Sequence, residues 1–211
     1  MMTNKDEIML QESMKSSCSV SNEDNKRKNI TKLPSDFNCE RYGIKCRMAT
    51  IEDSAFIVSL RTNQKLSKYL HHTDNDVEKQ KVWMRKYLER NARGEDYYFV
   101  YTYNDIPFSV NRIYNITDHS ATGGSWLCIP GTLPEVSIAS LLLMRDILFE
   151  FLVKDYDLFD VQDGNKQVRK LHIMMGAKRV GMTDDQENFS LFKEDYFKKR
   201  ESFMELLHLN R

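Results

Sequence analysis

Residues 161–181, VQDGNKQVRKLHIMMGAKRVG, decide the fold of this chain. They predict the end of a strand, a short helix that begins after Asn165 and stops before Gly176, and the start of a second strand. An Asn at the N-cap can accept a hydrogen bond from a backbone N–H two or three residues later. Gly readily adopts the left-handed conformation that ends many helices. The residues whose spacing gives this helix one apolar face are Val168, Leu171 and Met175.

The composition narrows the class of protein. The 211 residues suit one domain, and 31 basic and 31 acidic residues give no net charge, so there is no electrostatic footprint for nucleic acid or an anionic membrane. No apolar run approaches the ~18 residues of a membrane span, and the N-terminal residues lack the order of a signal peptide. Four cysteines without CxxC spacing favour reduced thiols. We expect a cytoplasmic monomer or homodimer with no metal, nucleic-acid or membrane partner.

The first 40 residues differ in composition from the rest of the chain. They are rich in Ser, Asn, Lys and Glu and lack sustained apolar periodicity, which is typical of segments that bury too little apolar surface to fold. We therefore expect a disordered tail over residues 1–40. One domain then covers residues 41–211 and includes an additional helix at its C-terminus.

Capping residues and apolar runs divide this domain into strands and helices. The strands are expected at residues 43–48, 97–101, 106–114, 126–129, 158–161, 177–182 and 188–193. The helices are expected to begin at Thr50, at Asp74 or Asp76, near Val136 and after Asn165, with a last one in the C-terminal segment. Strands interleaved with helices, including one tight hairpin, predict an α/β (α+β) fold. Its central sheet is mixed and mostly antiparallel, with helices on both faces.

The order Asn-x-x-Val-x-x-Leu-His-x-x-x-Gly-Ala over residues 165–177 resembles the C-terminal motif of the Gcn5-related N-acetyltransferases. A second stretch, residues 130–140, leads from a strand into a helix N-terminus, where free N–H groups and the helix dipole favour an anion. In the family the corresponding loop reads Arg/Gln-x-x-Gly-x-Gly/Ala and holds the coenzyme A pyrophosphate. Here Pro134 and Ser137 replace the first two of these residues, and Ala139 matches the third. The resemblance also implies that the fourth and fifth strands, residues 126–129 and 158–161, splay apart.

The resemblance implies acetyl-CoA as the acyl donor and no metal. It places an oxyanion donor, a backbone N–H, on the strand at residues 126–129. Cys128 could act as the nucleophile of a covalent mechanism, but a cysteine on a buried strand usually serves as a small apolar residue. We therefore expect direct attack of the amine without a covalent enzyme intermediate. The cofactor contacts that the resemblance implies are Leu127, Cys128, Ile129, Ser137, Ile138, Ala139, Ser140, Asn165 and Lys170.

His172 stands where most members of the family carry a Tyr. Acyl transfer from a thioester needs a proton for the departing thiolate, and an imidazolium with a pKa of ~6.5 suits neutral pH. His172 is therefore one candidate proton donor, and a packing residue between helix and sheet is the other interpretation. Asp163, at the end of a strand, is a candidate base that acts through water.

The loop between the first two helices borders the acceptor pocket in the family. Adjacent histidines do not suit one metal ion on regular structure, so the pair His71-His72 is expected in an exposed polar loop and not in a metal site, and only the resemblance implies contact with the acceptor. The acceptor contacts expected by resemblance are Arg61, Tyr69, His71, His72, Trp83 and Trp126.

The sequence therefore predicts an N-acetyltransferase that moves an acetyl group from acetyl-CoA to a primary amine of a small molecule. The pattern is similar to members that acetylate amino-sugar nucleotides and to branches that modify protein N-termini, including ribosomal proteins. A catalytically inactive acyl-CoA-binding module of the same fold is the alternative. The altered pyrophosphate loop and the missing Tyr favour that alternative.

Overall fold

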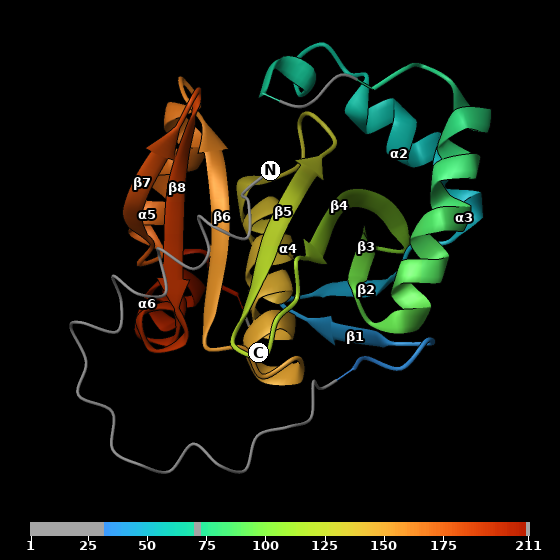
Figure 1. Cartoon of the computed structure of the whole chain (residues 1–211). Coiled ribbons are helices and arrows are strands. Elements are labelled where there is room, and N and C mark those ends of the chain that lie inside the picture. The colour runs from blue at the N-terminus through green and yellow to red at the C-terminus, as the bar shows by residue number, and fades with distance from the viewer. Residues whose placement is uncertain (1–31, 70–72, 210–211) are drawn as a thin grey trace.

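The computed structural model describes residues 32–69 and 73–209. Its eight strands form one sheet in the order β1-β2-β3-β4-β5-β6-β8-β7, shown in Figure 1. The strands are β1 (Asn38–Arg41), β2 (Ile44–Met48), β3 (Asp96–Tyr103), β4 (Ile106–Tyr114), β5 (Ser120–Cys128), β6 (Tyr156–Gln162), β7 (Lys178–Thr183) and β8 (Gln186–Phe192). Only β5 and β6 pair in parallel, so the predicted mixed, mostly antiparallel sheet is confirmed.

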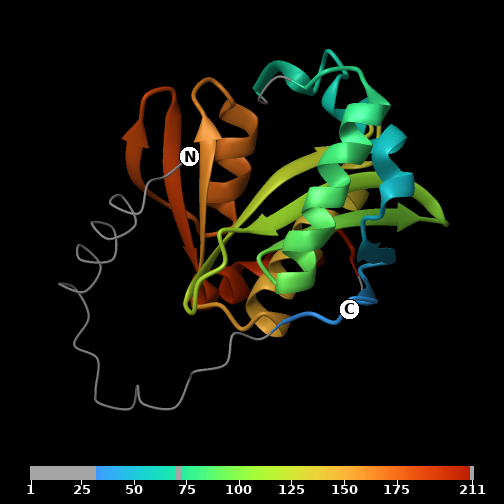
Figure 2. The same ribbon diagram turned by 45° about the vertical axis from the view of Figure 1, so that its right-hand side comes forward.

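Helices cover both faces of this sheet. They are α2 (Ser54–Arg61), α3 (Val77–Arg93), α4 (Pro134–Asp146), α5 (Lys166–Met174) and α6 (Lys193–Leu206), with short helical segments η1 (Ile51–Asp53), η2 (Ser67–Tyr69) and η3 (Ile147–Phe151). Figure 2 shows α3 lying across one face, while α4 and α6 contribute to the core on the other face. None of the helices in the described part of the chain has the length and apolar character needed to cross a membrane.

The aromatic strand β3 lies between the two helical layers. Tyr97, Phe99 and Tyr101 belong to the core on the side of α4, whereas Tyr98 and Val100 pack on the side of α2 and α3. Successive side chains of a strand point to opposite faces, so a strand covered on both faces is apolar throughout. The same residues predicted this strand from the sequence.

Local signals place the helix ends as the sequence predicted. The Asp76 carboxylate accepts a hydrogen bond from the Lys79 N–H at 3.0 Å, as an N-cap, and Gly94 follows α3 with a left-handed φ of 79°. The Asp53 carboxylate accepts the Thr50 N–H at 2.8 Å, as in a capping box. These interactions span only a few residues, which is why the sequence alone indicates them.

The strand β5 begins six residues earlier than predicted, at Ser120 and not at Trp126. The sequence suggested a polar turn here because of Gly123 and Gly124. A Cβ atom at position 123 would lie 2.6 Å from Met144 Cε and 3.2 Å from Asp157 Oδ2. This glycine therefore admits a close approach of α4 and β6 to the middle of a strand.

The described fold also begins before the expected domain start at residue 41. Leu33 and Phe37 are 4% and 7% exposed and belong to the core, and Asn38–Arg41 forms the edge strand β1. The tail predicted for residues 1–40 otherwise falls on residues 1–31, which lie outside the described residues.

Three cysteines of the described chain, Cys39, Cys46 and Cys128, carry free thiols, whereas Cys18 lies outside the described residues. Cys39 and Cys46 are far from CxxC spacing in the sequence. The antiparallel register of β1 and β2 nevertheless places them directly opposite each other.

The parallel pair β5 and β6 separates after two residues. Ser120 pairs with Tyr156 and Ala121 with Asp157. Two residues further along β5, the Gly123 N–H donates to the Asp157 carboxylate at 2.8 Å. A side chain thus takes the place of the next backbone partner, and the two strands diverge beyond it. The predicted splay is confirmed, although the strand pair is numbered β5 and β6 here.

Candidate active site

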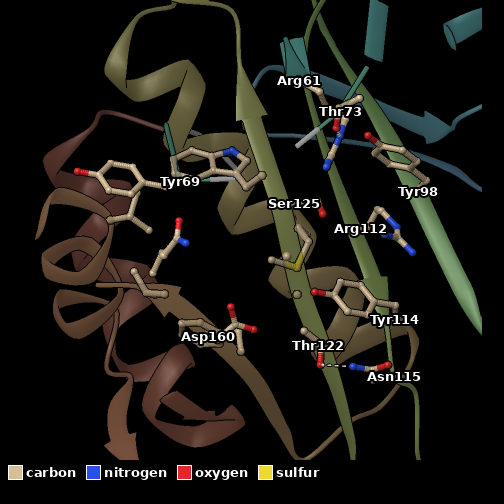
Figure 3. A pocket seen from close by; sticks show the side chains of 18 of the residues that line it. Arg61, Tyr69, Thr73, Tyr98, Arg112, Tyr114, Asn115, Thr122, Ser125 and Asp160 are labelled. Carbon is tan, nitrogen blue, oxygen red and sulfur yellow. Dashed lines mark hydrogen bonds between the residues drawn. The ribbon is translucent and has the colours of Figure 1, made fainter. Parts of the chain in front are cut away.

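A cavity of about 800 Å³ opens where β5 and β6 diverge. Its walls come from α2, η2 and α3, from the strands β3 to β6, and from α5. Figure 3 shows Arg61, Tyr98, Arg112 and Tyr114 gathered along one side of the cavity, with Tyr69 and Asp160 on the other. The cavity therefore joins the splay to the segment between the first two helices, as expected for donor and acceptor sites that meet.

One wall of the cavity combines guanidinium groups with aromatic rings. The Arg112 guanidinium carbon lies 5.0 Å from the centroid of the Trp83 ring and 4.8 Å from that of Tyr114, within the range of cation–π attraction. Arg112 and Arg90 both bind the buried carboxylate of Asp96, at 2.6 and 3.1 Å. Two cations thus share one anion behind the Trp83 and Tyr114 rings, while Arg112 itself lines the cavity.

Arg61 lies above the same wall. Its Nε donates to the Thr73 hydroxyl at 2.8 Å. The neighbouring Tyr98 is fully buried, and burial raises the pKa of its phenol to about 12, although Arg61 and Arg112 act in the opposite direction. Tyr98 therefore keeps its proton at neutral pH and remains a neutral hydroxyl in the cavity wall.

The opposite wall is formed by η2, β6 and the start of α5. The Tyr69 hydroxyl donates to the Gly164 carbonyl at 3.0 Å, which joins η2 to the loop between β6 and α5. Asn165 lies next to this contact and lines the cavity. Its side chain makes no capping hydrogen bond, so the capping interaction expected from the sequence is wrong, although the residue does occupy the N-cap position.

His172 is only 8% exposed and lines the inner end of the cavity. Its Nδ1 atom lies 2.8 Å from Nη2 of Arg145. An arginine can only donate a hydrogen bond, so Nδ1 accepts and the ring proton resides on Nε2. Burial and the Arg145 charge hold the pKa of His172 well below its usual range. The imidazolium that the sequence suggested is therefore not the state favoured here, and the ring is neutral at neutral pH.

Asp163 lies outside the cavity. It is exposed, and its Oδ1 accepts the Gly164 N–H at 2.8 Å. Asp160, three residues earlier on β6, lines the cavity instead. The sequence signal for Asp160 is a charged residue within an otherwise apolar strand, Leu-Phe-Asp-Val. Burial raises the pKa of Tyr114 to about 12, and the negative charge of Asp160 contributes to this rise.

The expected cofactor contacts before and within α4 are arranged differently from the prediction. Ala139 and Ser140 are fully buried, and the Ser140 hydroxyl accepts the Trp126 indole N–H at 2.9 Å. Ile138 packs partly buried against the core. The Ser137 N–H already donates to the Leu133 carbonyl at 2.9 Å, so it is not available to a ligand.

The first turn of α4 is a weak anion site. Pro134 has no N–H to offer, and Glu135 places an acidic side chain in the same turn, where it repels a phosphate. Lys170 is exposed on α5 and does not line the cavity. The predicted pyrophosphate contacts at Ser137, Ile138, Ala139, Ser140 and Lys170 therefore gain no support from the geometry.

The backbone of β5 is better placed to bind a ligand. The Ile129 N–H donates to the Phe108 carbonyl of β4 at 2.8 Å. Because successive N–H groups of a strand point to opposite edges, the N–H of Cys128 is directed toward the gap with β6, and that of Leu127 toward β4. Ser125 adopts a left-handed φ of 54° at a bulge opposite β4, which redirects β5 as it leaves β6.

The Cys128 thiol is not poised as a nucleophile. It donates to the Ser109 hydroxyl at 3.3 Å, and burial raises the pKa of this thiol. A thiolate is the reactive form of cysteine, and the environment disfavours it. Direct attack on a thioester is therefore easier to reconcile with this site than a covalent intermediate.

Four of the six expected acceptor contacts line the cavity: Arg61, Tyr69, Trp83 and Trp126. Their role as acceptor contacts stays a prediction. His71 and His72 lie outside the described residues. Within the described part of the chain, no group of His, Cys, Asp and Glu side chains is arranged to hold a metal ion.

Solved structures that resemble this fold include several acetyltransferases. An apo structure of FdhC, described as a nucleotide-linked sugar GNAT, is 28% identical, with a TM-score of 0.73 over 82% of this chain and 99% of that chain. Ribosomal-protein-S5-alanine acetyltransferase from Vibrio fischeri is 15% identical, with a TM-score of 0.65 over 76% and 99% of the two chains. Spermidine N-acetyltransferase from Vibrio cholerae, in complex with CoA and spermine, is 14% identical, with a TM-score of 0.64 over 74% and 98%.

No protein-family model and no curated protein matches the chain. The two likenesses at 14% and 15% identity support the fold alone. Together with FdhC and the splayed sheet, they show that the chain has the fold of the Gcn5-related N-acetyltransferases, as the sequence motifs predicted. Acetyl transfer is the general activity that the names of these structures share.

Proposed function

We propose that the chain is an N-acetyltransferase that moves an acetyl group from acetyl-CoA to a primary amine by direct attack. The observation that carries this proposal is the continuity of the cavity. It connects Asn165 and His172, beside the splay, with the cationic and aromatic wall around Arg112 and Trp83. A thioester held along β5 and an amine held beside α3 would meet in this one cavity.

Asp160 and His172, which line this cavity, and the Cys128 N–H further along β5 divide the chemistry among them. Asp160 takes a proton from the ammonium group of the acceptor through a water molecule, which frees the nitrogen lone pair. The nitrogen then bonds the carbonyl carbon, and the Cys128 N–H stabilises the oxyanion that develops. As the carbon–sulfur bond breaks, one of the two protons left on nitrogen passes to the thiolate, and the other stays on the amide. His172, being neutral, donates a hydrogen bond from Nε2 to the sulfur and not a proton.

The acceptor we favour is an amino sugar linked to a nucleotide. Such a molecule carries phosphate charges apart from its reactive amine, and the guanidinium groups of Arg61 and Arg112, which both line the cavity, suit those charges. Trp83 and Tyr114 add aromatic surface for a sugar or base. The name of FdhC, a nucleotide-linked sugar GNAT, points in the same direction.

The test is release of free thiol from acetyl-CoA with three amines: a nucleotide-linked amino sugar, a polyamine and a peptide with a free N-terminus. We expect turnover with the first. The variant Arg61→Gln should then raise KM for this acceptor ~10-fold, because a charge-assisted hydrogen bond is lost, with KM for acetyl-CoA unchanged. Arg93→Gln is the matched control, since Arg93 pairs with Glu95 away from the cavity. Turnover with the polyamine or peptide alone would contradict the proposed acceptor.

The second candidate is an inactive acyl-CoA-binding module, favoured by the neutral state of His172 and by Glu135 at the start of α4. Both candidates predict that acetyl-CoA at 100 times its Kd stabilises the protein by ~2.7 kcal/mol. Stabilisation without thiol release for any amine would select the inactive module. No stabilisation at millimolar acetyl-CoA would contradict both candidates.

A further inference from the structure

Arg145 on α4 is fully buried and is the largest of the fully buried side chains. Each nitrogen of its guanidinium group contacts a different neighbour. Nε faces Asp157 Oδ2 at 3.4 Å, Nη2 faces His172 Nδ1 at 2.8 Å, and Nη1 faces Met175 Sδ at 2.7 Å. The planar guanidinium thus connects β6 to the C-terminal end of α5.

Packing alone does not require a charge at this position. A buried ion pair is often no more stabilising than apolar residues of similar volume, and most of the buried residues of α4 are apolar. The charged pair instead fixes the direction of the hydrogen bonds around it. Asp157 neutralises Arg145 and uses its other oxygen to hold the Gly123 N–H of β5 at 2.8 Å. The network therefore reaches every element that surrounds the inner end of the splay.

The consequence falls on the His172 ring. Because Arg145 is a donor only, it fixes the Nδ1 atom as an acceptor and leaves the proton on Nε2. The ring also lies against Phe159, with 4.5 Å between centroids and 53° between planes, so its tilt is restricted as well. The charged groups that face His172 are Arg145 from α4 and, behind it, Asp157 from β6.

We propose that Arg145 is a positioning residue that holds His172 in the Nε2–H tautomer, so that a hydrogen-bond donor and not a proton donor faces the departing sulfur. The role of this donor rests on the proposed acetyl transfer. Asp157 acts one step further back, since it orients Arg145 and binds the backbone of β5. The residue type at position 172 and the buried arginine thus form one unit, in which an imidazole N–H stands where the family usually carries a hydroxyl.

The tautomer is measured directly by NMR of the protein with ¹⁵N-labelled histidine. The His172 signals are assigned by their loss in His172→Gln. We expect the wild-type ring to show protonated Nε2 and unprotonated Nδ1, with no titration between pH 5 and pH 8. In Arg145→Met we expect a mixture of tautomers and a titration inside that range. A wild-type Nδ1–H tautomer, or a wild-type titration near pH 6.5, would overturn the proposal.

Kinetics supply an independent test through a double-mutant cycle. Arg145→Met should lower kcat ~10-fold or more, with KM for acetyl-CoA nearly unchanged, and this effect should disappear in the His172→Ala background, because Arg145 acts through His172. Equal losses in both backgrounds would overturn the positioning role. If Arg145→Met does not fold, Arg145→Lys keeps the charge without the fork, and the wild-type spectrum still decides the tautomer. The expected spectrum without turnover of any amine would contradict the proposed function and leave the arrangement of Arg145 and His172 supported.

Discussion

The Gly123 N–H of β5 donates to the Asp157 carboxylate of β6 at 2.8 Å, directly beyond the last backbone pair of these two strands. A carboxylate in place of a carbonyl ends the strand pairing without leaving a buried N–H unsatisfied. The fully buried side chain of Asp157 therefore accounts for the divergence of the two strands. This contact also ties the origin of the cavity to Arg145 and His172.

The space around Gly123 leads to a first prediction. In Gly123→Ala the new methyl group would lie 2.6 Å from Met144 Cε and 3.2 Å from Asp157 Oδ2, so Met144 must move and the contact with Asp157 is strained. We expect a loss of roughly 1–3 kcal/mol in the free energy of unfolding, as for other overpacked sites. Urea unfolding measures it. Gly181→Ala on β7 is the control, because its methyl would meet only Asn188 Nδ2 at 3.8 Å; equal effects of the two substitutions would refute this account.

The Asp157 carboxyl leads to a prediction about pH. Burial raises its pKa to about 6 from an ordinary 3.8, although Arg145 and the Gly123 N–H act in the opposite direction. The folded state then binds the proton more tightly than the unfolded state. Its contribution to stability is complete below about pH 4, falls as the pH rises toward 6, and is constant above that. Because one pKa unit corresponds to 1.36 kcal/mol, the decline is at most roughly 3 kcal/mol.

The measurement is urea unfolding of the wild type and of Asp157→Asn between pH 4 and pH 7.5. We expect the free energy of unfolding of the wild type, minus that of the variant, to decrease up to pH 6 and then level off. A difference that rises over this interval would show that the pKa of Asp157 is lowered in the folded state. That outcome would mean that the ion pair with Arg145 affects the pKa of Asp157 more strongly than burial does.

Two aspartates on or next to β6 allow a matched comparison of catalytic roles. Asp160 lines the cavity, whereas Asp163 is exposed and bonded to the Gly164 N–H. If Asp160 accepts the amine proton through water, Asp160→Asn should lower kcat ~10²-fold at neutral pH and recover part of the rate at higher pH, where the free amine is more abundant. Asp163→Asn should leave kcat within about twofold. Steady-state kinetics with a saturating amine decide between them, and the reverse order of effects would restore Asp163 as the base.

The N-terminal segment allows a prediction about truncation. Deleting residues 1–31 retains Leu33 and Phe37, whereas deleting residues 1–38 removes both from the core. Burying two such side chains contributes roughly 3–6 kcal/mol before the entropy of ordering is subtracted. We expect the shorter deletion to leave the Tm nearly unchanged and the longer one to lower it by several degrees. Thermal melts of both proteins test this, and indistinguishable melts would show that this part of the core is dispensable.

The elements that sequence reasoning predicted are those with short-range causes. Asp76 and Gly94 cap α3 through contacts within a few residues, and the aromatic run of β3 reflects its burial on both faces. The site residues depend on longer-range contacts. Arg145 and His172 are 27 residues apart, and the sequence does not reveal that a guanidinium would neutralise the ring. Gly123 resembled a turn residue because its true neighbours, Met144 and Asp157, are distant in the sequence.

The contact between Tyr69 and Gly164 has a mechanical consequence. The strands β5 and β6 are joined at the beginning of β6, through Tyr156 and Asp157, and the Tyr69 hydroxyl bridges the two halves of the molecule again just after β6 ends. Together these two connections bound the gap between β5 and β6 at both ends of β6. The proposed acetyl transfer therefore takes place in a gap whose width is held at both ends, and loss of the Tyr69 hydroxyl would release one of them.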